Sequence, residues 1–194
     1  MQVFIGYKFT RHPLVSGVVA VFMCLTVAVY AASNAREYPQ VFVTETTPVE
    51  VTDPSVKAYL QLVNGLDHPD WRARAEALYA EELYYSDTFM MSESRAEIVK
   101  HMGELREGRT FKLIPLDVMQ GEQGTYIVWS IETGFSVLGR EIDAASIGVT
   151  LFRFNAAGEI EFQQDFWDST QGFYQHVPLL GGALRTIRDR VAGQ

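Results

Sequence analysis

The stretch ASIGVTLFRFNAAGEIEFQQDFW, residues 145–167, decides the fold. Two runs rich in β-branched and aromatic residues flank the turn cluster NAAG at 155–158, a pattern typical of a hairpin of antiparallel strands. Two runs of the same kind precede it, at 110–119 and 125–137, and the turn clusters QGEQG and LGRE separate them. The sequence therefore predicts four strands joined as hairpins.

Three helices are expected before these strands, because apolar residues recur there at a spacing of three and four. The first follows the Asp-Pro pair at 53–54, a typical helix start. The second begins at Trp71 and continues through an amphipathic stretch that ends before Asp87. The third carries the capping-box pair Ser94 and Glu97 at its start.

Helices followed by antiparallel strands predict an α+β fold in which the helices cover one face of the sheet. Because the sheet is long and twisted, we expect it to curve into a cone around the N-terminal helices and to enclose an apolar pocket. The predicted domain covers 53–171. A helical extension is expected over 172–194, with a break at the glycine pair 181–182.

The N-terminal 35 residues predict export. An uncharged apolar run at 14–32 follows Lys8 and Arg11, which is typical of a signal peptide or a signal anchor. Whether residues 1–35 are cleaved or stay in the membrane is left open. Residues 36–52 are expected to form a linker, so the domain lies on the non-cytoplasmic side of a cell envelope, anchored, periplasmic or secreted.

Composition narrows the possible partners. The chain has 194 residues, 47% of them hydrophobic, which permits one packed domain. A net charge of −8 argues against nucleic acid as a partner. The single cysteine, Cys24, lies in the apolar run, and the histidines show no ligand spacing, so we expect no disulfide, no metal and no cofactor.

Three segments carry a resemblance to a known superfamily. They read AYLQLVNGLD at 58–67, EALYAEELYYSDT at 76–88 and VTLFRFNAAGEIEFQQDFWDSTQ at 149–171. Together with the order of the elements, they resemble the nuclear transport factor two-like superfamily, which includes ketosteroid isomerases, scytalone dehydratase and SnoaL-like polyketide cyclases. The resemblance covers residues 53 to about 171 and implies the cone-shaped fold.

The same resemblance suggests three catalytic residues. Tyr59 lies five residues before Asn64, as does the tyrosine of the isomerases that polarises the substrate oxygen. Asp87 matches their catalytic base, and Asp168 matches the aspartate that transfers protons in the cyclases. Thr150 falls where the isomerases have a protonated aspartate, so the second oxyanion donor of that family is absent from its position.

Further candidates to contact a ligand are polar or aromatic residues on the predicted elements: Tyr85, His101, Trp129, Thr150 and Phe166. Structural roles compete with all of these assignments. Asp87 is equally typical of a helix end, Asp168 of a helix cap, and Tyr59 of a core position.

Alternation along the last strand places its side chains on two faces. Phe162, Gln164, Phe166 and Asp168 share one face, whereas Gln163, Asp165 and Trp167 share the other. The sequence does not decide which face lines the pocket.

These features predict an exported domain that binds an apolar small molecule, with or without turnover. The first alternative is an isomerase, dehydratase or cyclase that abstracts a proton next to a carbonyl group, with Asp87 as the base. Burial in the pocket is then expected to raise the pKa of Asp87. The second alternative is a structural module that forms a homodimer through the sheet.

Overall fold

The structure is a computed structural model that describes residues 48–193. These residues fall into two units, one within 36–174 and one that contains 175–194. Each unit is described on its own.

Of the elements within 48–193, the first unit holds all the strands and most of the helices. In chain order its elements are α3 (Pro54–Val63), α4 (Trp71–Leu78), β1 (Tyr79–Ser86), β2 (Met91–Ser94), α5 (Arg95–Leu105), β3 (Thr110–Gly121), β4 (Gly124–Val137), β5 (Arg140–Phe154), β6 (Ile160–Trp167) and α6 (Ser169–Gly172). The predicted α+β fold is confirmed.

The six strands form one curved, open sheet in the order β2-β1-β6-β5-β4-β3. The strands β3 to β6 pair as consecutive antiparallel hairpins, as predicted. The pair β1 and β6 is parallel. This pairing brings the end of β1 beside β6, a segment about 80 residues later in the chain.

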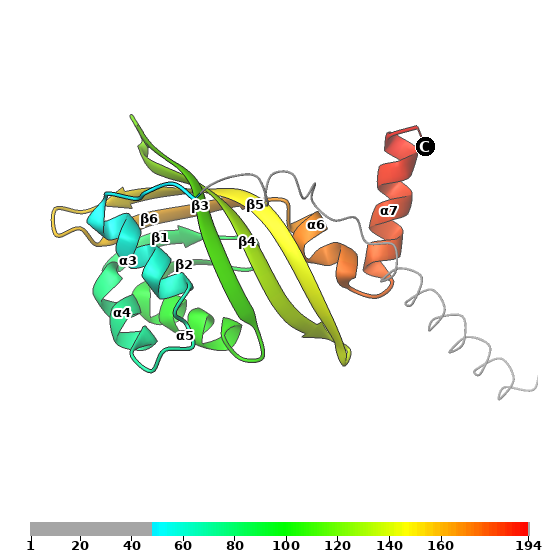
Figure 1. Ribbon diagram of the computed structural model, residues 1–194, viewed down its shortest axis with the longest axis horizontal. Coiled ribbons are helices and arrows are strands. Elements are labelled where there is room, and N and C mark those ends of the chain that lie inside the picture. Colours follow the sequence, from blue (N-terminus) through cyan, green and yellow to red (C-terminus); the bar gives the residue numbers. More distant parts are fainter. Residues whose placement is uncertain (1–47, 194) are drawn as a thin grey trace, which may run out of the picture. The chain divides into compact units, whose positions relative to one another are not determined.

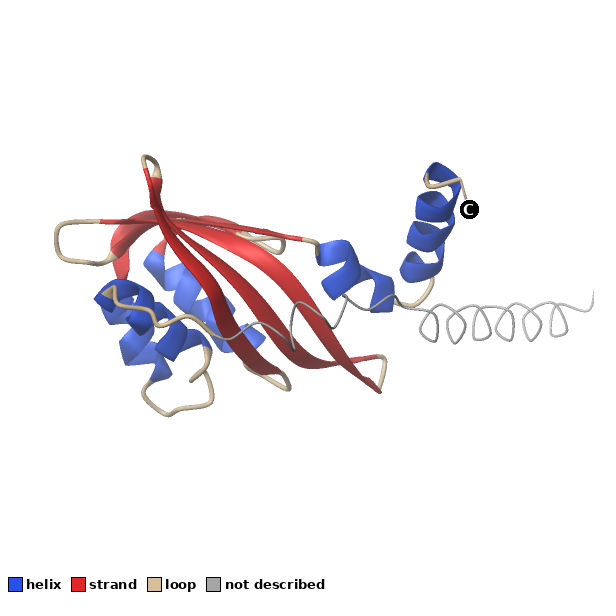
Figure 2. Cartoon of the chain, turned by 45° about the horizontal axis from the view of Figure 1, so that its top comes forward, coloured by secondary structure: helices blue, strands red, loops and turns tan. Residues whose placement is uncertain are grey.

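Helices α3, α4 and α5 lie against one face of the curved sheet (Figures 1 and 2). The main core cluster lies between these layers and includes Val56 and Leu62 from α3, Ile98 from α5 and Phe152 from β5. The predicted curvature of the sheet around the N-terminal helices is therefore present.

The start of the first helix follows the sequence prediction. The Asp53 side chain caps α3 and accepts hydrogen bonds from the backbone N–H groups of Ser55 and Val56, at 2.9 and 3.0 Å. Pro54 occupies the first turn, where a missing N–H costs no helical hydrogen bond. Further along the chain, the Asn64 amide exchanges two hydrogen bonds with the backbone of Leu113 and so ties the end of α3 to β3.

The predicted second helix is too long. It ends at Leu78, and the residues up to Ser86 form strand β1 instead. Within the strand, Leu83 and Tyr85 are buried in alternation, and Tyr84 on the other face stacks on Phe162 of β6 at 5.0 Å between ring centroids. The partner that favours a strand is distant in sequence, so local periodicity alone suggested a helix. The sequence prediction missed β1 for this reason, and it also missed β2, which pairs with β1.

The capping box at the third helix is only half correct. Ser94 is the N-cap of α5, but its side chain makes no capping hydrogen bond. The Glu97 carboxylate instead accepts a hydrogen bond from the hydroxyl of Ser92. The neighbouring strand β2 thus supplies the partner that the pattern had assigned to the N-cap.

The second unit contains α7 (Leu180–Val191), after the short 3-10 helix η1 (Tyr174–His176). The predicted break at Gly181 and Gly182 is absent, because α7 runs through both glycines. A side chain at Gly181 would meet the Gln175 carbonyl oxygen at 2.0 Å. Glycine is therefore required for close backbone packing rather than for ending the helix.

No helix within 48–193 is long and apolar enough to cross a membrane. The apolar run at 14–32 and the linker up to residue 47 lie outside the described residues, so the signal peptide or anchor stays a prediction.

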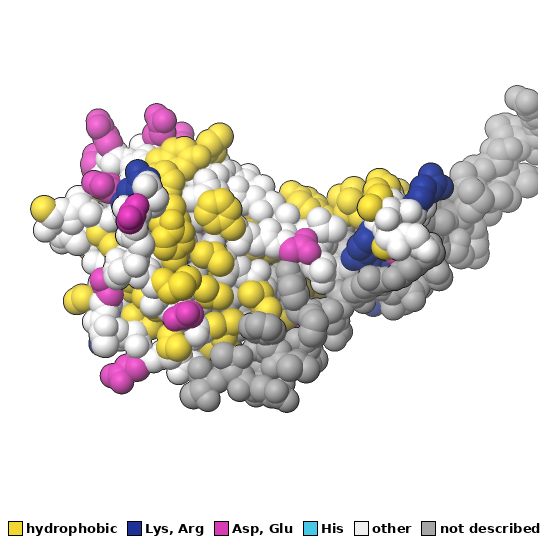
Figure 3. All heavy atoms as spheres, turned by 90° about the horizontal axis from the view of Figure 1, so that it is seen from above, with side chains coloured by type: hydrophobic (Ala, Val, Ile, Leu, Met, Phe, Trp, Pro, Cys, Tyr) yellow, Lys and Arg dark blue, Asp and Glu magenta, His cyan; other side chains and the backbone are white. Residues whose placement is uncertain are grey.

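Apolar side chains gather on one face of the molecule, with acidic side chains at their edges (Figure 3). The sheet surface that faces away from the helices carries Val128, Val149, Leu151 and the half-exposed Phe166. The homodimer through the sheet stays a prediction.

Candidate functional site

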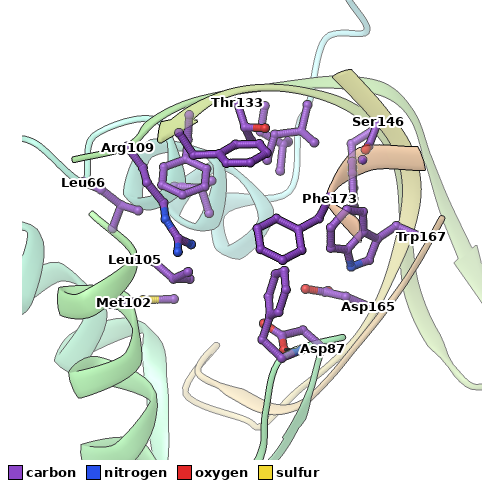
Figure 4. A pocket seen from close by; sticks show the side chains of 18 of the residues that line it. Leu66, Asp87, Met102, Leu105, Arg109, Thr133, Ser146, Asp165, Trp167 and Phe173 are labelled. Atoms are coloured by element: carbon purple, nitrogen blue, oxygen red, sulfur yellow. Dashed lines mark hydrogen bonds between the residues drawn. The ribbon is translucent and has the colours of Figure 1, made fainter. Parts of the chain in front are cut away.

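A cavity of about 150 Å³ lies between the concave face of the sheet and helices α3 and α5 (Figure 4). Most of the side chains that line it are aliphatic or aromatic. Three charged side chains also line it: Asp87, Arg109 and Asp165. Such a cavity fits an apolar molecule with few polar groups.

The Asp87 carboxylate lies just after β1 and is surrounded by hydrogen-bond donors. Its Oδ1 accepts from the backbone N–H groups of Phe89 and Met90, at 2.6 and 2.8 Å. Its Oδ2 accepts from the Tyr85 hydroxyl at 2.9 Å and lies 3.4 Å from Nε2 of His101, at the outer limit of a hydrogen bond. Both oxygens are therefore occupied within the fold.

These donors decide the pKa of Asp87. Burial is the largest single effect and would raise the pKa, but the hydrogen bonds from His101, Met90, Phe89 and Tyr85 together outweigh it and lower the pKa below its ordinary value. The expected rise in the pKa of Asp87 is therefore wrong, because the hydrogen bonds reverse the effect of burial. Asp87 is an ionised, fully bonded carboxylate and a weak base.

Asp165 projects from β6 into the same cavity and forms the centre of a hydrogen-bond network. Its Oδ1 accepts from the Thr150 hydroxyl at 2.8 Å, and this hydroxyl accepts from the Trp129 indole at 2.9 Å. The Gln163 amide donates to both Asp165 oxygens at 3.2 and 3.3 Å. Tyr79 donates to the Gln163 carbonyl at 2.7 Å and so fixes the orientation of that amide. Oδ2 of Asp165 receives only the longest of these bonds.

Asp165 has the opposite pKa shift from Asp87. Burial is the main cause and raises the pKa to about 7, helped by the negative charge of Asp87, while the hydrogen bonds from Thr150 and Gln163 oppose the rise. Near neutral pH, Asp165 therefore exchanges its proton readily.

Three buried tyrosines surround the two carboxylates, and burial raises the pKa of Tyr59, Tyr79 and Tyr85 well above the ordinary value. The charges of Asp165 and Asp87 raise these pKa values further. All three phenols are therefore neutral hydrogen-bond donors at physiological pH.

Two of the three tyrosines donate a hydrogen bond to a side chain of the site: Tyr79 to Gln163 and Tyr85 to Asp87. The Tyr59 hydroxyl lies beside Thr150 and Gln163, where hydrogen bonding opposes the rise of its pKa. Tyr59 also lines the cavity. It is the phenol best placed to donate to a bound ligand.

Arg109 lies on the other side of the cavity. Figure 4 shows its side chain extending inwards beside Leu66 and Leu105, away from Asp87 and Asp165. Within 48–193, no group of three or more His, Cys, Asp or Glu side chains is arranged to hold a metal ion.

Solved structures with the same architecture are numerous, although no protein-family model and no curated protein matches the sequence. One is a hypothetical protein with a ketosteroid isomerase-like fold from Catenulispora acidiphila, in complex with trimethylamine (TM-score 0.54, 16% identity, 66% of this chain and 96% of that one). Another is a SnoaL-like polyketide cyclase, so named provisionally, from Shewanella putrefaciens (0.52, 12%, 75% and 100%). A third, also provisionally named a SnoaL-like polyketide cyclase, is from Shewanella denitrificans (0.51, 15%, 72% and 98%).

The chain has the nuclear transport factor two-like fold. At such low identity the likeness concerns the fold and not the chemistry, because one fold can carry many functions. The chemistry of this nuclear transport factor two-like domain therefore depends on the side chains that line its own cavity.

The structure brings most of the predicted site residues together. Tyr59, Tyr85, Asp87 and Trp129 all line the cavity. Thr150 is fully buried and does not line the cavity, but its hydroxyl donates a hydrogen bond to Asp165, which does.

Three predicted residues lie elsewhere. Asp168 caps α6 by accepting hydrogen bonds from the backbone N–H groups of Thr170 and Gln171, and it does not line the cavity. Phe166 points to the opposite face of the sheet and is 54% exposed. His101 lies behind Asp87 and acts on the cavity only through that carboxylate. The alternative role of Asp168 as a helix cap is the one that the structure has.

Two important residues were missed as candidates, Asp165 and Arg109. Alternation had already placed Asp165 with Gln163 and Trp167 on one face of β6, and this is the face that lines the nuclear transport factor two-like cavity. Asp165 pairs with Thr150 across β5 and β6. The acid expected at position 150 is therefore supplied from the adjacent strand. Nothing in the local sequence distinguishes Arg109 from other surface arginines.

Proposed function

We propose that this chain binds an apolar carbonyl compound in the cavity and transfers a proton at the carbon next to the carbonyl group, with Asp165 as the group that takes up and returns the proton. The observation that carries the proposal is the contrast between the two carboxylates. In a pair of titratable groups with separated pKa values, the group near neutrality is suited to exchange protons.

Asp165 rather than Asp87 fits this role. Both oxygens of Asp87 accept strong hydrogen bonds, which would have to weaken before the carboxylate could take up a proton. Oδ2 of Asp165 accepts only the 3.3 Å bond from Gln163. Thr150 and Gln163 hold the carboxylate in place whether it is protonated or not.

The chemical step is balanced without a cofactor. The C–H bond next to the carbonyl breaks, and its proton forms an O–H bond with Asp165. The electron pair forms a C=C bond, and the carbonyl oxygen becomes an enolate, to which Tyr59 donates a hydrogen bond. In a β,γ-unsaturated ketone, return of the proton to the γ-carbon gives isomerisation. In a β-hydroxy ketone, the hydroxide leaves the β-carbon and takes the proton from Asp165, which gives dehydration with release of water.

The lack of an aspartate at position 150 is an objection to turnover, because the isomerases use one there to stabilise the oxyanion. Asp165 removes that objection, because a titrating carboxyl group lies next to Thr150 in space. The location of the domain is part of the same proposal. The apolar run at 14–32 predicts export, so the reaction takes place outside the cytoplasm.

Exchange of substrate hydrogen for deuterium tests the proposal directly. Ligands are first selected from enolisable aryl ketones by thermal shift, and their exchange in deuterated buffer is followed by NMR. Asp165→Asn keeps the acceptor for Thr150 but cannot take up the proton, so we expect binding to persist and exchange to slow by about 100-fold or more.

Asp168→Asn is the matched control, because asparagine also caps helices and the site lies outside the cavity. It should exchange at the parent rate. Parent-like exchange by Asp165→Asn would remove Asp165 from the mechanism. A parent chain that binds these ketones without any exchange would instead establish the binding module.

A further inference from the structure

Arg109 is unusual among the residues that line the cavity. Among the described residues it is the only lysine or arginine that lines the cavity, and it is the last residue before strand β3. No hydrogen bond or ion pair joins its guanidinium to another residue within 48–193. Figure 4 shows that the side chain nevertheless extends into the cavity rather than away from it.

The neighbours of Arg109 do not explain this position. Leu66 and Leu105 are the labelled side chains beside it, and neither offers an acceptor. The surface of the chain is acidic overall, with 24 acidic against 16 basic residues. Arg109 is an exposed residue that also lines the cavity, so water solvates its charge and an anionic group of a ligand can take the place of that water.

The cavity therefore has two electrically different ends. Asp87 and Asp165 lie at one end, and Arg109 lies at the other. Most of the other lining residues are apolar, Phe111 and Ile131 among them. An elongated ligand that matches this arrangement has an anionic group at one end, an apolar body and an uncharged polar group at the other.

We propose that the ligands of this cavity are apolar ketones that carry a carboxylate at the end remote from the ketone, and that Arg109 binds this carboxylate. The inference rests on the proposed function, because it places the ketone at Asp165 and Tyr59. Arg109 is then a residue of specificity: it selects acids and sets their orientation.

Orientation follows from charge. With the carboxylate toward Asp87, the ligand would bring two negative charges together in a poorly solvated space. With the carboxylate toward Arg109, the ligand gains a charge-assisted hydrogen bond and presents the ketone to Asp165. The planar guanidinium can bind both carboxylate oxygens, which lysine cannot do in the same geometry.

A matched series of probes tests the proposal. The ω-benzoylalkanoic acids with chains of two to four methylene groups carry an aryl ketone and a remote carboxylate, and their methyl esters lack the charge. Calorimetry gives the dissociation constant for each acid and ester. We expect the best acid to bind the parent at least about fivefold more tightly than its ester.

Two variants assign this preference. Arg109→Gln should bind acid and ester equally, and Arg109→Lys should retain a reduced preference. Arg140→Gln, at another exposed arginine outside the cavity, should behave like the parent. Added salt should reduce the ratio of the ester and acid dissociation constants in the parent and should not change this ratio in Arg109→Gln.

Other results would overturn the inference. Equal binding of acid and ester by the parent, a preference that persists in Arg109→Gln, or failure of every acid to bind would each do so. The deuterium exchange of uncharged aryl ketones is measured separately, so the proton-transfer function can stand when the preference for acids fails.

Discussion

Asp87 and Asp165 are the same residue type and line the same cavity, but they differ in pKa because hydrogen bonds outweigh burial at Asp87 and burial outweighs hydrogen bonds at Asp165. Asp87 lies where a loop turns two backbone N–H groups toward it, and a tyrosine and a histidine add to them. Asp165 lies in the middle of a strand, where the backbone is committed to the sheet, so only side chains can donate. Residue type alone therefore does not fix the protonation state; the balance between burial and hydrogen bonding decides it.

This difference gives a prediction about stability. The ordinary pKa of 3.8 describes Asp165 in the unfolded chain, and the value of about 7 describes it in the folded chain. Between these values the folded chain holds one proton more than the unfolded chain, so the free energy of unfolding should fall as the pH rises from about 4 to about 7. The fall should be about 4 kcal/mol and should level off above a pH of about 7.

Asp87 has the opposite sign and a different range. Its lowered pKa gives stability that is present above the ordinary value of 3.8 and is lost as the pH falls further. Denaturant unfolding between about pH 4 and about pH 7 should therefore show the fall in the free energy of unfolding in the parent and not in Asp165→Asn. An equal fall in both would assign it to another group.

At the scale of elements, strand pairing places Trp129 directly opposite Gly148 in β4 and β5. A Cβ at Gly148 would lie 2.4 Å from two ring atoms of Trp129 and 2.9 Å from the carbonyl oxygen of Phe166. The glycine thus makes room for the indole that lines the cavity and donates to Thr150. Gly148 is a poor strand former in a strand rich in β-branched residues, but a larger residue there would clash with the indole of Trp129.

Gly148→Ala should therefore destabilise the fold by about 1 to 3 kcal/mol through overpacking. The measurement is denaturant unfolding of the parent, Gly148→Ala, Trp129→Phe and the double variant. The smaller ring should relieve part of the clash, so the double variant should be more stable than the sum of the single effects predicts. Strict additivity would show that the indole does not press on this position.

Strand β1 shows why element types were only partly predictable. The four hairpin strands carry their turns and their alternation locally, so the sequence predicted them correctly. Strand β1 follows α4 without a loop and pairs in parallel with β6. Its Tyr79 and Leu83 lie four residues apart and so also satisfy helical spacing, and only the distant partner resolves the ambiguity.

For the whole molecule, the exported location is the main prediction that concerns residues outside 48–193. A reporter enzyme fused after Gln194 and active only outside the cytoplasm should be active, because Lys8 and Arg11 precede the apolar run at 14–32. Replacing both residues with glutamate should reduce that activity. A fusion active only as a cytoplasmic reporter would contradict export.

The sequence by itself determined the fold class, the hairpin strands, the cap at Asp53 and the placement of Tyr59 and Asp87 as residues to examine. These follow from local patterns, since turns, caps and alternation involve residues a few positions apart. The tertiary structure alone decided which face of β6 lines the cavity, and with it the choice of Asp165 over Asp168. Desolvation and hydrogen bonding fix these roles, and both depend on Thr150, Trp129 and other groups that only folding brings near.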